Sequence, residues 1–236
     1  MTTNNFIVGT GRCGTSLLAH VLSQCGADFG PVKALNRFKD GYMENTAIND
    51  ANMRIIKYYE LRESFPFVPI RLLNWIRNRS LKTIECQLGK RTWVKSPWLT
   101  DTLRDIIGHD NIEGKILGIV RHPSEYALSL WRSSSQALDH HTSTRIWKKY
   151  VERNMNLLLL LETHGGCIIS FHDLLNPRSD KWAKKISKAF GEFSAKDLVH
   201  ARNKLVDKHA KHVGKRVYVP EEVQELWEYL EKKSLS

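Results

Sequence analysis

The chain has 236 residues, of which 42% are hydrophobic and 26% are charged. A chain of this length and composition can bury one substantial core, so we expect a single domain over residues 1–236. Lysine and arginine outnumber aspartate and glutamate by 36 to 25, and the formal net charge of +11 favours anionic partners such as nucleotides, nucleic acids, sulfated glycans or membrane surfaces. The longest apolar run, residues 157–161, is far shorter than the roughly 20 residues of a membrane-spanning helix, which argues against a membrane span.

The cysteines are scattered along the chain with no CxxC pair, which argues against a zinc site and against a disulfide framework. They are Cys13, Cys25, Cys86 and Cys167. The first residues contain no basic segment followed by an apolar stretch, as a signal peptide would. We therefore expect a protein of a reducing compartment, with a cytoplasmic location.

Four short apolar segments rich in β-branched and aromatic residues predict strands at residues 6–8, 92–94, 115–120 and 167–171. Between and beyond them, helical spacing predicts helices at residues 18–25, 44–59, 124–137 and 144–162, and a last helix that Pro220 opens. Alternation of strands and helices is typical of a mostly parallel sheet. The predicted fold is an α/β three-layer sandwich with a phosphate-binding loop of the P-loop type.

One segment, residues 65–79 (FPFVPIRLLNWIRNR), fits this pattern poorly. Two prolines precede an apolar and basic stretch that looks helical. We expect either an insertion that packs into the core or a lid that binds the acceptor.

The loop Gly-Thr-Gly-Arg-Cys-Gly-Thr-Ser at residues 9–16 follows the first predicted strand and opens the first predicted helix. Glycines in such a turn allow backbone N–H groups to converge on a phosphate, and the helix N-terminus adds partial positive charge. The spacing resembles that of the nucleotide-triphosphate loop, but Thr15 stands where that loop has its lysine. Arg12 offers a cation instead, and the order of elements predicts an anion-binding loop rather than a merely structural turn.

Two further cations follow predicted strands, Lys95 after the second and Arg121 after the third. Because ligands of open α/β sheets lie beyond the carboxyl ends of the strands, we expect both side chains near the loop. Neither strand end offers the acidic residue that holds magnesium in nucleotide triphosphatases. A kinase with a degenerate loop and a non-catalytic binder of nucleic acid or sulfated glycan remain as alternatives.

Taken together, five motifs resemble those of sulfotransferases that use 3′-phosphoadenosine 5′-phosphosulfate (PAPS), in particular the carbohydrate-type and bacterial-type members. GTGRCGTSLL is similar to the 5′-phosphosulfate loop of this family, and IVRHPSEYALSLW to its 3′-phosphate motif. GYMENTAIND, WVKSPWL and ISFHDLLNP are similar to its Gly-aromatic-x-Glu, Lys-x-Pro and Tyr-Glu-Asp-Leu segments. The resemblance spans residues 6–191.

The resemblance implies that PAPS is the donor and 3′-phosphoadenosine 5′-phosphate (PAP) the product, with no metal. It places Arg121 and Ser129 on the 3′-phosphate and Phe171 near the adenine, whereas His172 replaces the glutamate of its element. The 5′-phosphosulfate would be held by Gly11, Arg12, Cys13, Gly14, Thr15 and Ser16.

The resemblance also implies the catalytic residues, with Glu44 as the base that takes the acceptor proton and Lys95 and Arg12 stabilising the departing phosphate. From the residues alone, Glu44 could instead only cap or favour a helix N-terminus, and Lys95 could be a surface lysine. Pro97 stands where cytosolic small-molecule sulfotransferases have a histidine. The expected acceptor is a hydroxyl of a carbohydrate or small metabolite, not a nucleic acid.

Two other features attract attention in the sequence. Lys215 and Arg216 either close over the 3′-phosphate or are charged residues of a solvent-exposed surface segment. The second arrangement is the more common one for adjacent basic residues. The histidine pairs His140-His141 and His209-x-x-His212 lack a third converging ligand, so we assign no metal to them.

Overall fold

The computed structural model describes residues 4–30, 32, 43–65, 67–88, 93–107, 114–133, 140–206 and 217–235, except for the side chains of 132–133 and 140–142. Its elements, in chain order, are β1 (Asn5–Val8), α1 (Thr15–Gln24), α2 (Thr46–Ser64), α3 (Ile70–Leu88), β2 (Trp93–Lys95), α4 (Leu99–Ile107), β3 (Ile116–Val120), α5 (Pro123–Ser133), α6 (His140–His164), β4 (Gly166–Ser170), α7 (Phe171–Leu175), α8 (Lys181–Phe190), α9 (Ala195–Val206) and α10 (Glu221–Leu235).

The four strands form one sheet in the order β2-β1-β3-β4, and every neighbouring pair is parallel. In the register, Phe6 of β1 faces Val94 of β2 on one side and Ile116 of β3 on the other. All four strand ends therefore lie along the same edge of the sheet, as predicted from the strand–helix alternation.

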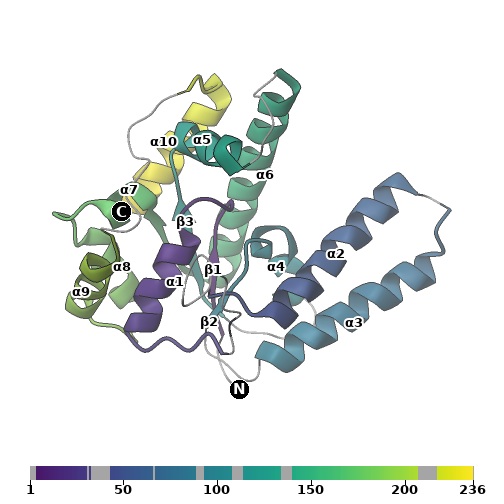
Figure 1. Ribbon diagram of the computed structural model, residues 1–236, viewed down its shortest axis with the longest axis horizontal. Coiled ribbons are helices and arrows are strands. Elements are labelled where there is room, and N and C mark those ends of the chain that lie inside the picture. Colours follow the sequence, from purple (N-terminus) through teal and green to yellow (C-terminus); the bar gives the residue numbers. More distant parts are fainter. Residues whose placement is uncertain are drawn as a thin grey trace.

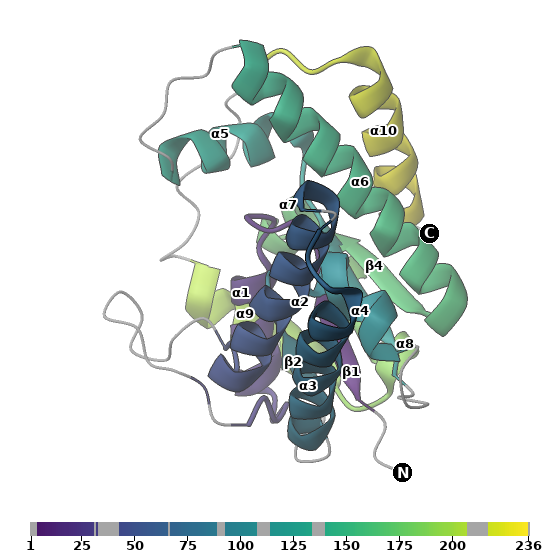
Figure 2. The same ribbon diagram turned by 90° about the vertical axis from the view of Figure 1, so that its right-hand side faces the viewer.

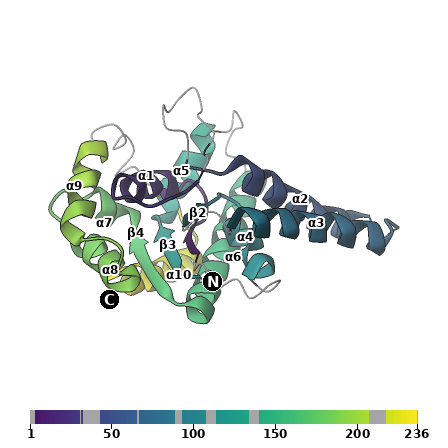
Figure 3. The ribbon, with the colours of Figure 1, turned by 90° about the horizontal axis from the view of Figure 1, so that it is seen from below.

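Alternate side chains of the strands enter two separate hydrophobic cores. Ile7, on one face, joins the core formed with α1, α7, α8 and α9. Phe6 and Val8, on the other face, join the core formed with α2, α3, α4, α6 and α10. Figures 1 and 3 show these two helix layers on opposite sides of the sheet, and in Figure 2 α6 and α10 lie beside β4. The predicted three-layer α/β fold is confirmed.

Several element boundaries differ from the prediction. Strand β4 ends at Ser170, and Phe171 begins α7, because the Ser170 side chain accepts a hydrogen bond from the N–H of His172 and caps that helix. Helix α2 begins at Thr46 and continues to Ser64, five residues beyond the predicted end. Residue 92 lies outside the described residues. Helices α4, α7, α8 and α9 were not predicted.

Residues 65–79 do not pack into the core, so the first of the two expectations for this segment is wrong. Of its described residues only Leu73 is buried, and Phe67 is 95% exposed. The segment instead forms the turn between α2 and α3 and the beginning of α3. Within the described part of the chain, no helix is both long and apolar enough to cross a bilayer.

Candidate functional site

The loop between β1 and α1 has a backbone that only a glycine-rich sequence adopts without strain. Gly11 and Gly14 have φ angles of +78° and +100°, and even Arg12 has a left-handed φ of +54°. Gly14 is the N-cap of α1 and has no side chain to cap it, and no acidic residue lies in the first turn. The N-terminus of α1 therefore has neither a side-chain cap nor a carboxylate in its first turn, and its partial positive charge favours an anion there.

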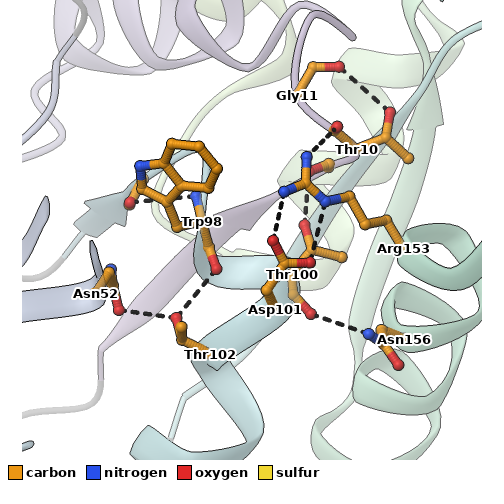
Figure 4. A network of polar contacts seen from close by, with 11 residues as sticks. Thr10, Gly11, Asn52, Trp98, Thr100, Asp101, Thr102, Arg153 and Asn156 are labelled. Carbon is orange, nitrogen blue, oxygen red and sulfur yellow. Dashed lines mark hydrogen bonds and ion pairs between the residues drawn. The ribbon is translucent and has the colours of Figure 1, made fainter. Parts of the chain in front are cut away.

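A second feature of the loop is that buried side chains from α4 and α6 hold its carbonyl groups (Figure 4). Arg153 of α6 donates from Nη1 to the carbonyl of Thr10 at 2.9 Å. The same guanidinium forms an ion pair with Asp101 of α4, in which Nε lies 3.0 Å from Oδ1. Thr100 Oγ1 donates to the carbonyl of Gly9 at 2.6 Å. These contacts fix the loop from the side away from α1.

A cavity of about 480 Å³ opens in front of the loop. The ends of all four strands contribute to it, as expected for an open α/β sheet. Its lining consists of Gly11, Arg12, Gly14, Thr15, Ser16, Leu17, His20, Glu44, Lys95, Pro97, Arg121, Ser129 and Phe171. All the predicted site residues except Cys13 thus lie around one cavity.

Cys13 faces away from this cavity. Its side chain is fully buried in the core on the α1 side of the sheet, and burial raises the pKa of its thiol. If Cys13 contributes to anion binding, it does so through its backbone.

Two lining residues of α1, Leu17 and His20, were not predicted from the sequence. Leu17 directly follows Ser16, and His20 lies one helical turn beyond it, so both reach the same cavity.

At the cavity wall the buried Lys95 forms an ion pair with Glu44, whose side chain is partly exposed. The Lys95 ammonium also donates to Ser16 Oγ at 3.1 Å, which connects the end of β2 to the start of α1. Lys95 is only 3% exposed, and burial lowers its pKa while the nearby Glu44 carboxylate opposes that shift. The reading of Lys95 as a surface lysine is therefore wrong.

Glu44 is positioned by its neighbours rather than by a capping role. The N-cap of α2 is Asn45, whose side chain accepts from the N–H of Ile48 at 3.0 Å, and Met43 has a left-handed φ of +55°. Asn49 donates to Glu44 Oε2 at 2.6 Å, while Oε1 faces Lys95. The carboxylate is thus held toward the cavity from the first turn of α2.

Arg121, after β3, is held by three contacts of its guanidinium and one of its carbonyl group. It donates to the carbonyl of Arg12 at 3.1 Å and pairs with Glu125 at 3.0 Å. Its guanidinium lies 4.6 Å from the centre of the Phe171 ring, and Tyr150 donates to its carbonyl at 2.9 Å. Its orientation is therefore fixed before any ligand binds.

Phe171 and Ser129 complete this end of the cavity. A Cβ atom at Gly14 would overlap the Phe171 ring, so the ring occupies the space that the glycine leaves open. Ser129 Oγ accepts from Arg12 Nε at 3.2 Å, which brings the predicted 3′-phosphate residues into contact with the predicted 5′-phosphosulfate loop.

A second cavity, also of about 480 Å³, lies between α2, α4 and α6 and is lined by Asp101 and Asp105 among others. Its two carboxylates are already bound by Arg153 and Arg77, and no strand end reaches it. This second cavity is lined neither by the backbone of the loop nor by Arg12, Lys95 and Arg121. We therefore place the functional site at the loop.

Metal ligands are a separate question. Among the residues that the structure describes, no group of three or more histidine, cysteine, aspartate or glutamate side chains could hold a metal ion. The side chains of His140 and His141, and residues 209, 212, 215 and 216, lie outside the described part.

Among solved structures, the chain is similar to the sulfotransferase domain from the curacin biosynthetic pathway, with a TM-score of 0.58 and 15% sequence identity. The similarity covers 98% of this chain and 98% of that domain. At this identity the comparison establishes the fold, and the reaction has to be inferred from the site. No family model and no curated protein sequence matches the chain.

Proposed function

We propose that the protein is a sulfotransferase that moves a sulfuryl group from PAPS to a hydroxyl group of a carbohydrate or small metabolite. The observation that carries the proposal is the convergence of Arg12, Lys95 and Arg121 with the N-terminus of α1 and the carboxylate of Glu44 around one cavity.

The charges of the cavity suit a donor with two phosphate positions. Arg121 and Ser129 both contact Arg12 and would hold the 3′-phosphate, since arginine suits bidentate phosphate contacts. Lys95 contacts Ser16 in the first turn of α1, and these two residues with the helix N-terminus would hold the 5′-phosphosulfate. Arg12 connects the two groups through its contact with Ser129.

Glu44 is the base in this proposal. The acceptor oxygen forms a bond to sulfur while the bond between sulfur and the 5′-phosphate oxygen breaks, and the acceptor proton passes to the Glu44 carboxylate. PAP leaves with the bonding electrons on its 5′-phosphate. Lys95 and Arg12 stabilise that charge without reorganising, because the contacts described above already hold Lys95 in place.

Nucleotide binding tests the donor assignment. A ligand that binds only the folded state raises the melting temperature, so PAP should stabilise the protein, whereas ATP with magnesium and a sulfated oligosaccharide should not. Arg121→Met should abolish the shift, and Arg145→Met, which removes an exposed arginine on α6, should not. Each shift is measured against the melting temperature of the same variant without ligand.

A shift with ATP and magnesium but none with PAP would favour a kinase and overturn the proposal. A response to the oligosaccharide alone would favour a glycan-binding protein. Transfer itself is measured with radiolabelled PAPS and a panel of sugar, phenol and aliphatic hydroxyl acceptors.

A further inference from the structure

Helices α2 and α3 form a hairpin, which we call the arm. Figures 1 and 3 show it extending away from the rest of the molecule. It is attached to α4 in its outer half, where Asp105 binds Arg77 at 2.7 Å and accepts from the Tyr59 hydroxyl at 2.5 Å. Tyr58 donates to Asn74 at 3.2 Å and joins the two helices to each other. The arm is thus a firmly anchored structure and not a loose loop.

The far end of the arm is strongly apolar and exposed. Of the twelve large hydrophobic side chains that are exposed in the described part of the chain, six lie within residues 61–75. These six, which we call the arm tip, are Leu61 (37% exposed), Phe65 (56%), Phe67 (95%), Ile70 (51%), Leu72 (51%) and Trp75 (56%). Such clustering is unusual for a free surface and marks a binding surface.

Positive charge surrounds the arm tip. Arg62, Arg71 and Arg79 are exposed there against the carboxylates of Glu60 and Glu63, and the guanidinium of Arg79 lies 5.2 Å from the centre of the Trp75 ring. The chain as a whole also carries a net charge of +11. The partner should therefore be both apolar and negatively charged.

The distribution of the apolar side chains decides which kind of partner fits. On α3, Ile70 and Leu72 point in directions about 160° apart around the helix axis, because each residue advances by about 100°. A flat protein surface or a groove would contact one side of such a helix. The interface of a lipid bilayer accepts side chains from all sides of a protruding tip, with the arginines at the level of the headgroups.

We propose that the arm tip inserts into the interface of an anionic lipid membrane and holds the protein at its surface. Helix α2 begins next to Glu44 and has 19 residues, so the tip lies about 28 Å from the cavity at 1.5 Å per residue. Insertion leaves the cavity open to its ligands. The proposal thus stands independently of the reaction that the site performs.

Sedimentation with vesicles tests the proposal, and it requires neither donor nor acceptor. The protein should bind vesicles of phosphatidylcholine with phosphatidylserine at least about tenfold more tightly than vesicles of phosphatidylcholine alone, since each basic residue near the surface adds to the attraction. Added salt should weaken that binding. Arg71→Glu with Arg79→Glu should remove the preference for phosphatidylserine.

Replacement of the aromatic side chains tests insertion separately from charge. The triple variant Phe65→Ser, Phe67→Ser, Trp75→Ser should lose vesicle binding, with its melting temperature close to that of the parent because these side chains are exposed. The matched control is Met155→Ser with Leu159→Ser, which removes two exposed apolar side chains of α6 (53% and 44%) and should bind vesicles like the parent.

Absence of vesicle binding, or equal binding by the triple variant, would overturn the proposal. A doubled mass in solution that the triple variant lacks, without vesicle binding, would assign the arm tip to contact with a second copy of the chain. None of these results bears on PAP binding, so failure here and failure of the sulfotransferase proposal remain distinguishable.

Discussion

Replacement of Arg153 by methionine is the sharpest test of how the loop of residues 9–16 is held. Methionine has a similar length but provides neither charge nor donors. The change leaves the Thr10 carbonyl without its donor and Asp101 without its cation (Figure 4). Arg153 is 6% exposed, so water has little access to replace these contacts.

The expected loss of stability follows from the exposure of the two partners. Removal of one partner of a fully buried ion pair costs about 3–5 kcal/mol. The Asp101 side chain is 28% exposed and recovers part of its hydration, so we expect the free energy of unfolding to fall by about 3 kcal/mol, including the hydrogen bond to Thr10.

The expected loss of nucleotide affinity is a separate quantity. The left-handed conformation of Arg12 costs about 1–2 kcal/mol by itself and persists only while the surrounding structure holds it. Without Arg153 the loop relaxes and must be reordered by the ligand, which predicts about tenfold weaker PAP binding, equivalent to about 1.4 kcal/mol.

Chemical denaturation and calorimetric titration with PAP measure the two effects. The matched control is Lys148→Met on the same helix, which breaks an exposed ion pair with Glu152 and should change stability by less than about 0.5 kcal/mol. Unchanged PAP affinity in Arg153→Met, with reduced stability, would refute the idea that Arg153 orders the loop for binding.

Three further changes test other parts of the site. Glu44→Gln should lower turnover by about 100-fold or more, which is the usual contribution of a general base, while PAP affinity at neutral pH should change little. Turnover like that of the parent would exclude Glu44 as the base. Gly14→Ala should lower stability and weaken PAP binding at least about tenfold, because the new methyl group would collide with Phe171. The control is Gly26→Ala, at a glycine with a similar φ angle (+95°) but open space around it. It should lower the free energy of unfolding only by the backbone strain of about 1–2 kcal/mol. Burial raises the pKa of the Cys167 thiol from 9.0 to about 12, so its contribution to stability is complete below pH 9 and is lost as the pH rises toward 12. Cys167→Ala should therefore remove up to about 1.4 kcal/mol per pH unit from the alkaline slope of the free energy of unfolding, and an unchanged slope would contradict this assignment.

Local patterns were sufficient to predict the sheet and the loop. Short runs of β-branched residues marked all four strands, and glycines at positions 11 and 14 fall where the backbone has positive φ. The positions of Lys95 and Arg121 followed from one topological rule, that parallel strands end at the same edge. Each of these predictions needed only residues close in sequence.

The contacts that hold the site could not be predicted in the same way. Arg153 lies in the middle of α6, with no motif around it, and its partners Asp101 and Thr10 are 52 and 143 residues away in the chain. Helix α4, which supplies Asp101, was itself not predicted. The expectation that residues 65–79 pack into the core was wrong because a segment rich in phenylalanine, leucine and tryptophan resembles a core segment unless its surroundings are known.

The buried cations of the cavity are paired with carboxylates, which allows them to face an incoming anion without destabilising the free protein. Lys95 and Arg121 are 3% and 7% exposed, and an isolated charge at such a position costs several kcal/mol. Glu44 and Glu125 provide the compensating charge, so both cations stay oriented toward the cavity in the free protein. Arg12, which is exposed, is the remaining cation of the described lining and leaves the cavity with a net positive charge. In our proposal Glu44 therefore serves twice, first keeping the buried Lys95 protonated and then accepting the proton of the acceptor.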